Sequence, residues 1–225
     1  MRPRKGESAV TAAALQVAIF SDYVCPYCYL GAGLVDRLRR EAGLELEVTW
    51  LPFELHPGTP AQGRPLTDLF RQPEATIRCV HQDLKARAAE LGLPMEPPLV
   101  LYNTRAAHLL AEYARDQGRG DAVHRECFRM NFVEGRNLAD PDVLREVARR
   151  SGLDPEAALA ALSDPVYEER LQWSAQQAAA AGVTGVPTFI VNGRWRIVGA
   201  HPYPQMLAAF RRIQEEAKEQ APGEH

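Results

Sequence analysis

The stretch SDYVCPYC, residues 21–28, lies where an expected strand gives way to an expected helix. Before it, Leu15, Val17 and Ile19 alternate with other residues as on one face of a strand. After it, leucines recur every four residues, as on one face of a helix, at positions 30, 34 and 38. A Cys-x-x-Cys pair at such a junction is typical of a redox site, because the first helical turn brings both sulfurs within disulfide distance.

Each residue of the CPYC motif has an expected role. Pro26 suits the first helical position, which needs its φ angle and no N–H donor. Cys25 then lies at the N-cap, where free amides and the helix dipole stabilise a thiolate, so we expect it to be the attacking sulfur. Cys28 is expected to be less exposed and to act as the resolving thiol. Pro26 and Tyr27 are expected to tune the reduction potential, and Asp22, if close, would raise the pKa of Cys25.

The alternative for this pair is half of a zinc site or two inert thiols. Zinc sites normally use a second pair at similar spacing, whereas Cys79 and Cys127 are isolated in the sequence. Cys79 and His81 are two residues apart on a predicted helix and therefore point to roughly opposite sides. We expect no metal site, and we expect Cys79 and Cys127 to be buried as small hydrophobic residues.

A second functional element is expected in GVTGVPTF, residues 182–189. Pro187 precedes a predicted strand, a position that proline takes without any special role. The sharper hypothesis is a cis Val186–Pro187 bond, which would turn the Val186 backbone toward an extended substrate. We therefore predict Val186 and Pro187 to be substrate-binding residues.

The remaining pattern predicts a core interrupted by helices. A half-buried strand over 44–50 completes a strand–helix–strand unit, and a hairpin over 188–198 precedes a closing helix. We expect residues 10–60 and 181–218 to form the two halves of the core and 61–180 to form a helical insertion. Within the insertion, an N-cap aspartate and a first-turn proline predict three helix starts, at Asp140-Pro141, Asp154-Pro155 and Asp164-Pro165.

Composition narrows the choice of compartment and partners. The chain has 225 residues, 46% of them hydrophobic, and a net charge of -3, so we expect a folded protein that binds neither nucleic acid nor a membrane. The basic start and apolar residues 9–20 superficially resemble a signal peptide, but Thr11 and Gln16 interrupt the apolar run. We expect a cytoplasmic protein with a loose arm over residues 1–9, and a close cysteine pair that is catalytic in this reducing compartment.

The order of elements and four motifs resemble the DsbA family and, more narrowly, its cytoplasmic FrnE-like branch. The motifs cover residues 21–31, 103–108, 132–136 and 182–189. The resemblance implies an α/β fold, thioredoxin-like with an all-helical insertion, in which Cys25 is the nucleophile, Cys28 the resolving thiol and Pro187 a cis proline facing them. It implies partners that carry thiols or disulfides, either proteins or glutathione as a thiol partner, and neither a metal nor another cofactor. Some FrnE-like proteins have a second cysteine pair near the C-terminus, but no cysteine follows Cys127 here.

Two other functions remain open. Glutathione-dependent isomerases of the 2-hydroxychromene-2-carboxylate type and kappa-class transferases share this architecture, but they usually have serine at the first cysteine position. A holdase without turnover would use only an apolar groove near Val186.

Several polar residues have two interpretations. Asn103, Arg105 and His108 would line a small-molecule pocket in the isomerase, whereas the simpler interpretation has Asn103 capping a helix and His108 packing beside Leu109. Glu54 and His56 are interpreted as solvated loop residues.

Overall fold

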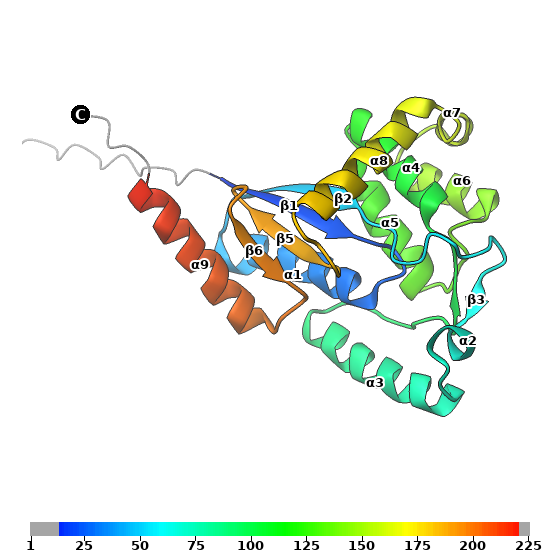
Figure 1. The fold of residues 1–225 in the computed structure, drawn as a ribbon, viewed down its shortest axis with the longest axis horizontal. Helices are drawn as coiled ribbons and strands as arrows, with labels where there is room; N and C mark the ends of the chain where they lie inside the picture. Colours follow the sequence, from blue (N-terminus) through cyan, green and yellow to red (C-terminus); the bar gives the residue numbers. More distant parts are fainter. Residues whose placement is uncertain (1–13, 221–225) are drawn as a thin grey trace, which may run out of the picture.

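Four strands form a mixed sheet at the centre of the structure (Figure 1). The computed structural model describes residues 14–220. β1 (Leu15–Ser21) pairs in parallel with β2 (Leu46–Pro52) and antiparallel with β5 (Thr188–Val191), which in turn pairs antiparallel with β6 (Trp195–Val198). The strand order is therefore β2-β1-β5-β6. The predicted alternation of β1 is confirmed, since Leu15, Val17 and Ile19 are buried. β2 begins two residues later than predicted.

Helices α1 (Pro26–Ala42) and α9 (Tyr203–Gln220) share one core with this sheet. The predicted leucine face of α1 is buried, and Met206, Phe210 and Ile213 bury the inner face of α9. α9 extends to Gln220, through the charged segment after residue 214. Gly31 in α1 permits a close approach, because a Cβ there would lie 3.2 Å from Pro187 Cγ. The start of α1 therefore packs directly against the residue that opens β5.

The insertion lies at the end of the sheet far from α9 (Figure 1) and shares a core with the CPYC segment and the start of α1, including Tyr23, Cys28 and Leu30. The three predicted Asp-Pro helix starts are confirmed, and each aspartate accepts a backbone hydrogen bond in the first turn. The insertion also contains a short helix and two short paired strands, β3 and β4, that were not predicted. Its elements are β3 (Arg64–Pro65), α2 (Leu66–Phe70), α3 (Glu74–Glu90), β4 (Val100–Leu101), α4 (Arg105–Asp116), α5 (Gly120–Phe132), α6 (Pro141–Arg150), α7 (Pro155–Ala161) and α8 (Pro165–Ala180).

Two predictions about the chain ends and the membrane are limited to the described residues. The expected arm over residues 1–9 lies outside them. Within residues 14–220, no helix combines the length and apolar character needed to cross a bilayer. The boundaries drawn between core and insertion stay predictions.

Candidate active site

The CPYC motif begins helix α1 as the sequence predicted. Cys25 is the N-cap, with extended backbone angles of φ −84° and ψ 114°, and Pro26 is the first helical residue. The Cys25 carbonyl accepts the N–H groups of Cys28 at 3.0 Å and Tyr29 at 3.3 Å, which closes the first turn. Both cysteines are free thiols, 5% and 0% exposed respectively. Cys28 is thus the more deeply buried of the two, as expected.

The two thiols have opposite tendencies to ionise. The pKa of Cys25 lies below its ordinary value, chiefly because the Cys28 thiol donates a hydrogen bond to the Cys25 thiolate. Burial opposes this effect, the backbone N–H groups of Cys28 and Tyr27 support it, and the charge of Asp22 again opposes it. The pKa of Cys28 is raised well above normal, first by burial and then by its contact with Cys25. Cys25 is therefore the better nucleophile.

The Val186–Pro187 peptide bond is cis, as predicted. The Cys25 thiol donates a hydrogen bond to the Val186 carbonyl, with a distance of 3.4 Å from sulfur to oxygen. On the far side of the bond, the Pro187 carbonyl accepts the Gly199 N–H at 2.7 Å. The structure thus brings the two predicted elements together, and the chain turns at Pro187 so that the Val186 carbonyl faces the attacking sulfur.

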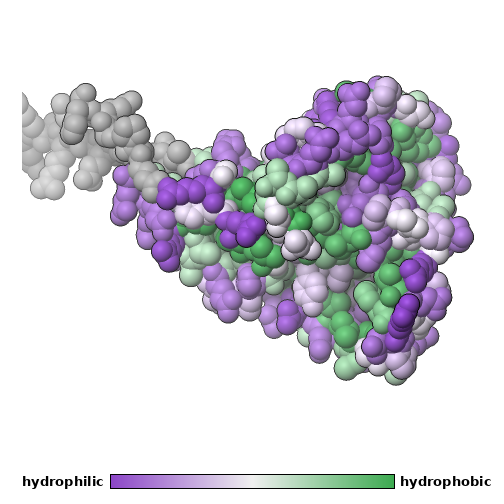
Figure 2. All heavy atoms as spheres, in the orientation of Figure 1, coloured by the Kyte–Doolittle hydropathy of each residue, from purple (hydrophilic) through white to green (hydrophobic). Residues whose placement is uncertain are grey.

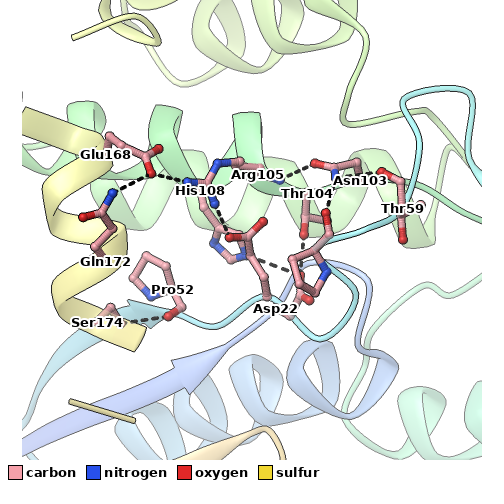
Figure 3. A network of polar contacts seen from close by, with 12 residues as sticks. Asp22, Pro52, Thr59, Asn103, Thr104, Arg105, His108, Glu168, Gln172 and Ser174 are labelled. Carbon is pink, nitrogen blue, oxygen red and sulfur yellow. Dashed lines mark hydrogen bonds and ion pairs between the residues drawn. The ribbon is translucent and has the colours of Figure 1, made fainter. Parts of the chain in front are cut away.

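A buried polar network lies directly behind the motif (Figure 3). The carboxylate of Asp22, 1% exposed, accepts hydrogen bonds from the Thr104 hydroxyl at 2.7 Å and the Leu55 N–H at 2.7 Å. His108 Nε2 lies 3.3 Å from the same carboxylate. Burial raises the pKa of Asp22, but the contacts with His108, Leu55 and Thr104 outweigh it and leave the pKa below its ordinary value. Asp22 is therefore a buried anion beside the motif.

His108 does more than pack beside Leu109, because it pairs with Asp22 and stacks on Tyr23 with ring centroids 4.7 Å apart. The simple interpretation of His108 was therefore wrong. Sequence reasoning missed this pair because its two members are 86 positions apart and only the fold brings them together.

The neighbouring polar residues hold loops in place. Asn103 accepts the Arg105 N–H at 2.9 Å, as a residue at a helix start does, and donates to the carbonyl of Thr59. Arg105 forms an ion pair with Glu54 and another with Glu168, and Figure 3 labels the second pair. The interpretation of Glu54 as solvated was wrong, since its side chain is 18% exposed and paired. Arg105 is therefore already neutralised by two carboxylates.

An apolar groove of about 520 Å³ runs from Cys25 toward α3. Three large hydrophobic residues stay exposed along it: Tyr27 (41%), Phe70 (56%) and Val80 (49%). In Figure 2 hydrophobic atoms reach the surface over α3. Among the described residues, no lysine, arginine, aspartate or glutamate lines this groove. His81, which does line it, has a pKa lowered by burial and by Arg78. His56 also lines it, so the groove offers a mainly apolar surface with two histidines beside the attacking sulfur.

Comparison with known proteins identifies this arrangement. The model of the DSBA-like thioredoxin domain family matches residues 16–211, which is most of the chain. The chain belongs to this family. The probable DsbA oxidoreductase SCO1869 from Streptomyces coelicolor is 30% identical, with a TM-score of 0.83 over 90% of this chain and 91% of the other. The fold is thus the DsbA-like thioredoxin fold with a helical insertion.

Two further solved structures share the fold of this DsbA-like chain at lower identity. A 2-hydroxychromene-2-carboxylate isomerase is 22% identical, with a TM-score of 0.74 over 92% of this chain and 99% of the other. The cytosolic disulfide reductase DsbM from Pseudomonas aeruginosa, solved with GSH, is 20% identical, with a TM-score of 0.63 over 91% of this chain and 98% of the other. The FrnE-like branch is not distinguished by these matches and stays a prediction.

The other two cysteines of this DsbA-like chain differ from each other. Cys127 is buried, as predicted, and burial raises its pKa far above the ordinary value. Cys79 is exposed, so the prediction that it is buried was wrong. It lies on the solvent side of α3. The next residue in that helix, Val80, lines the groove. Among residues 14–220, no group of three potential ligands is placed to hold a metal ion.

Proposed function

We propose that this chain is a thiol-disulfide oxidoreductase that uses Cys25 as nucleophile and Cys28 as resolving thiol. The observation that carries the proposal is the pairing of an N-cap thiol of lowered pKa with a buried thiol of raised pKa, one helical turn apart. The Cys25 thiolate attacks a substrate disulfide, giving a mixed disulfide and releasing one substrate thiolate. Cys28 then loses its proton and attacks Cys25 Sγ, and the second substrate sulfur leaves with the electron pair of the broken bond.

The Val186 carbonyl has a defined part in this reaction. In the free dithiol it accepts the Cys25 S–H, and an extended substrate strand would instead donate a backbone N–H to it. Pro187 holds this carbonyl beside the sulfur. We assign both residues to substrate binding, and we assign Pro26 and Tyr27 to tuning of the couple through the geometry of the first turn.

The groove favours a protein substrate over glutathione. Glutathione carries two carboxylates and an ammonium group, and among its described residues the groove beside Cys25 has no lysine, arginine, aspartate or glutamate to pair with them. A peptide with a large apolar side chain near its cysteine would bury that side chain against Phe70 and Val80. Glutathione in this proposal is a reductant or oxidant of the pair rather than a tightly held cofactor, and the expected compartment is the cytoplasm.

Trapping tests the proposed function. In Cys28→Ser, the mixed disulfide between Cys25 and a peptide disulfide cannot resolve, so we expect a stable adduct in mass spectra and loss of turnover. Both variants carry Cys79→Ser, because Cys79 is an exposed free thiol. Cys25→Ser in this background is the matched control and should give no adduct. A Cys28→Ser variant that turns over as fast as the wild type would contradict the two-thiol mechanism.

A second candidate function is isomerisation of a small substrate with glutathione. It is favoured by the cavity of about 520 Å³ beside Cys25, which is large enough for such a molecule. The variant Cys28→Ser separates the two functions when isomerisation is measured as well, because isomerisation with glutathione needs no resolving thiol and would be undiminished in Cys28→Ser.

A further inference from the structure

One side chain in the groove beside Cys25 combines burial with an unused hydrogen-bonding atom. Asn131, near the end of α5, lines the groove and is 2% exposed. Five other polar side chains along the groove are half-buried or exposed: Tyr27, His56, Gln72, Thr76 and His81. Asn131 therefore differs from them in being enclosed by the protein.

The amide of Asn131 has a defined orientation. Its Nδ2 donates a hydrogen bond of 2.9 Å to the Tyr23 carbonyl. Because a carbonyl oxygen can only accept, the amide nitrogen and not the amide oxygen must face Tyr23. Tyr23 is itself held in place, since its ring stacks on His108 with centroids 4.7 Å apart and meets the Phe128 ring at 5.2 Å. The Asn131 amide therefore cannot turn over without losing this hydrogen bond.

The amide oxygen of Asn131 has no partner of this kind. Among the described residues, no N–H or O–H group donates a hydrogen bond to Oδ1. Nor is this oxygen sealed from solvent, as the unpartnered hydroxyls of Ser21 and Ser151 are. Since Asn131 lines the groove, a hydrogen-bond acceptor of fixed orientation faces the space beside Cys25.

An acceptor in a mainly apolar wall imposes a requirement on whatever covers it. A peptide that packs against Phe70 and Val80 displaces water from the groove, and an acceptor left without a donor then lowers the affinity. A peptide N–H within reach of Asn131 Oδ1 removes this cost. The Val186 carbonyl, 3.4 Å from Cys25 Sγ, is a second acceptor and comes from the core. A peptide joined to Cys25 would therefore meet one acceptor from the core and one from the insertion.

We propose that Asn131 is a substrate-binding residue whose Oδ1 accepts a backbone N–H of the peptide that carries the disulfide. This inference rests on the redox function proposed above. It adds a directional contact to a groove that otherwise binds by apolar burial. The preferred substrate is then a peptide with a free backbone N–H at a defined position near its cysteine. Proline, which lacks this N–H, would be disfavoured at that position.

N-methylation of the substrate tests this contact. The probes are linear peptides with one leucine and one cysteine, the cysteine being blocked as a disulfide with 2-mercaptoethanol. Each peptide carries a single N-methyl group within about three residues of the cysteine, the reach of an extended strand across the site. Turnover is followed with glutathione as reductant, and the parent protein carries Cys79→Ser because Cys79 is an exposed thiol. We expect two sensitive positions, one facing Val186 and one facing Asn131, where methylation lowers kcat/KM about tenfold.

The variant Asn131→Ala assigns one of the two positions. It should lower kcat/KM for the unmethylated peptide about tenfold, and methylation at the position that faces Asn131 should then have no further effect. The position that faces Val186 should stay sensitive. Asn131→Asp keeps an oxygen acceptor and loses the amide donor to Tyr23, so both positions should stay sensitive in it.

Asn137→Ala is the matched control. Asn137 also donates to a backbone carbonyl, that of Ala61, but it does not line the groove, so its methylation pattern should match that of the parent protein. Fewer than two sensitive positions in the parent protein would overturn the contact, and this outcome does not depend on the folding of any variant. The same two positions in Asn131→Ala would also overturn it. Absence of turnover with every peptide, the unmethylated one included, would instead overturn the proposed function.

Discussion

Two opposing influences act on the Cys25 thiolate at the scale of single residues. Its contacts with Cys28 and with the first-turn amides stabilise the anion, whereas the buried Asp22 carboxylate destabilises it. His108 Nε2 lies 3.3 Å from that carboxylate. The electrostatic effect on Cys25 therefore depends on Asp22 together with His108. The insertion, which supplies His108, thereby takes part in setting the reactivity of a thiol in the core.

Replacement of Asp22 by asparagine tests this influence. Asp22→Asn keeps an acceptor for the Leu55 N–H and removes the charge, so we expect the pKa of Cys25 to fall by about one unit. A more stable Cys25 thiolate favours the reduced, dithiol form. The reduction potential of the Cys25–Cys28 couple should therefore rise by roughly 30 mV for each 1.4 kcal/mol by which the thiolate is stabilised. The pH dependence of alkylation in a Cys79→Ser background measures the pKa. Asp83→Asn, at an exposed position on α3, is the control, and an unchanged or higher pKa in Asp22→Asn would contradict the account.

The sequence predicted the site residues whose roles depend on local geometry. Cys25, Pro26 and Cys28 could be placed because a helix start determines their positions from neighbouring residues. Asp22 precedes the motif directly, but its partner Thr104 comes from a distant element, and no local pattern announces that contact. The same limit explains the wrong prediction for Cys79, since the apolar residues near it in α3 line an open groove instead of a closed core.

At the scale of elements, an aromatic stack joins the insertion to the sheet. The His124 ring of α5 stacks on Trp50 of β2 with centroids 3.8 Å apart and an interplanar angle of 19°. Its Nδ1 lies 3.3 Å from the Tyr23 hydroxyl, in the loop that precedes the cysteines. Burial lowers the pKa of His124 well below 6.5, with smaller contributions from His108 and Arg125. The contact between α5 and β2 therefore depends on an uncharged imidazole.

This dependence predicts a loss of stability in mild acid. Below about pH 6.5 the unfolded chain takes up a proton at His124 and the folded chain does not, so the free energy of unfolding falls as the pH decreases toward the folded pKa. His124→Phe keeps a ring on Trp50 and should lack this component. Urea unfolding at pH 7.5 and 5.5 measures the difference, and equal pH dependence in both proteins would rule out this role for His124.

Elements whose boundaries depend on local signals were predicted, and those that depend on distant pairing were not. The aspartates at 140, 154 and 164 cap their helices with their own side chains, which short-range sequence reveals. The β3–β4 pair joins Arg64 to Leu101 across a long connection, and neither two-residue strand has a periodicity of its own. A helical insertion could therefore be predicted, but the small sheet that lies beside the groove could not.

For the whole molecule, the position of the insertion relative to the core creates the reactive surface. The core supplies the cysteines and Val186, and the insertion supplies α2 and α3 on the other side of the groove (Figure 1). The fold itself could be predicted because the CPYC and cis-proline segments each mark one half of the core. The groove could not, since it depends on how the helices of the insertion pack against the start of α1.

A charge placed in the groove tests its part in substrate choice. Val80→Asp should lower kcat/KM about tenfold for a peptide disulfide with a large apolar side chain, because one buried valine contributes about 1.5 kcal/mol. Reduction of bis(2-hydroxyethyl) disulfide, which has no such side chain, should be unaffected. Val198→Asp is the matched control, since Val198 is 52% exposed and does not line the groove. Equal loss on both substrates would contradict a binding role for the groove.

The central claim is that Cys25 and Cys28 form one reversible redox couple. Equilibration in glutathione buffers of graded ratio, followed by alkylation and mass spectrometry of the peptide that carries both cysteines, measures it directly. We predict one two-electron transition in which both thiols disappear together, with a midpoint inside the range of known thiol-disulfide oxidoreductases, about −270 to −120 mV. If no disulfide forms between Cys25 and Cys28 at any ratio, the redox function is contradicted.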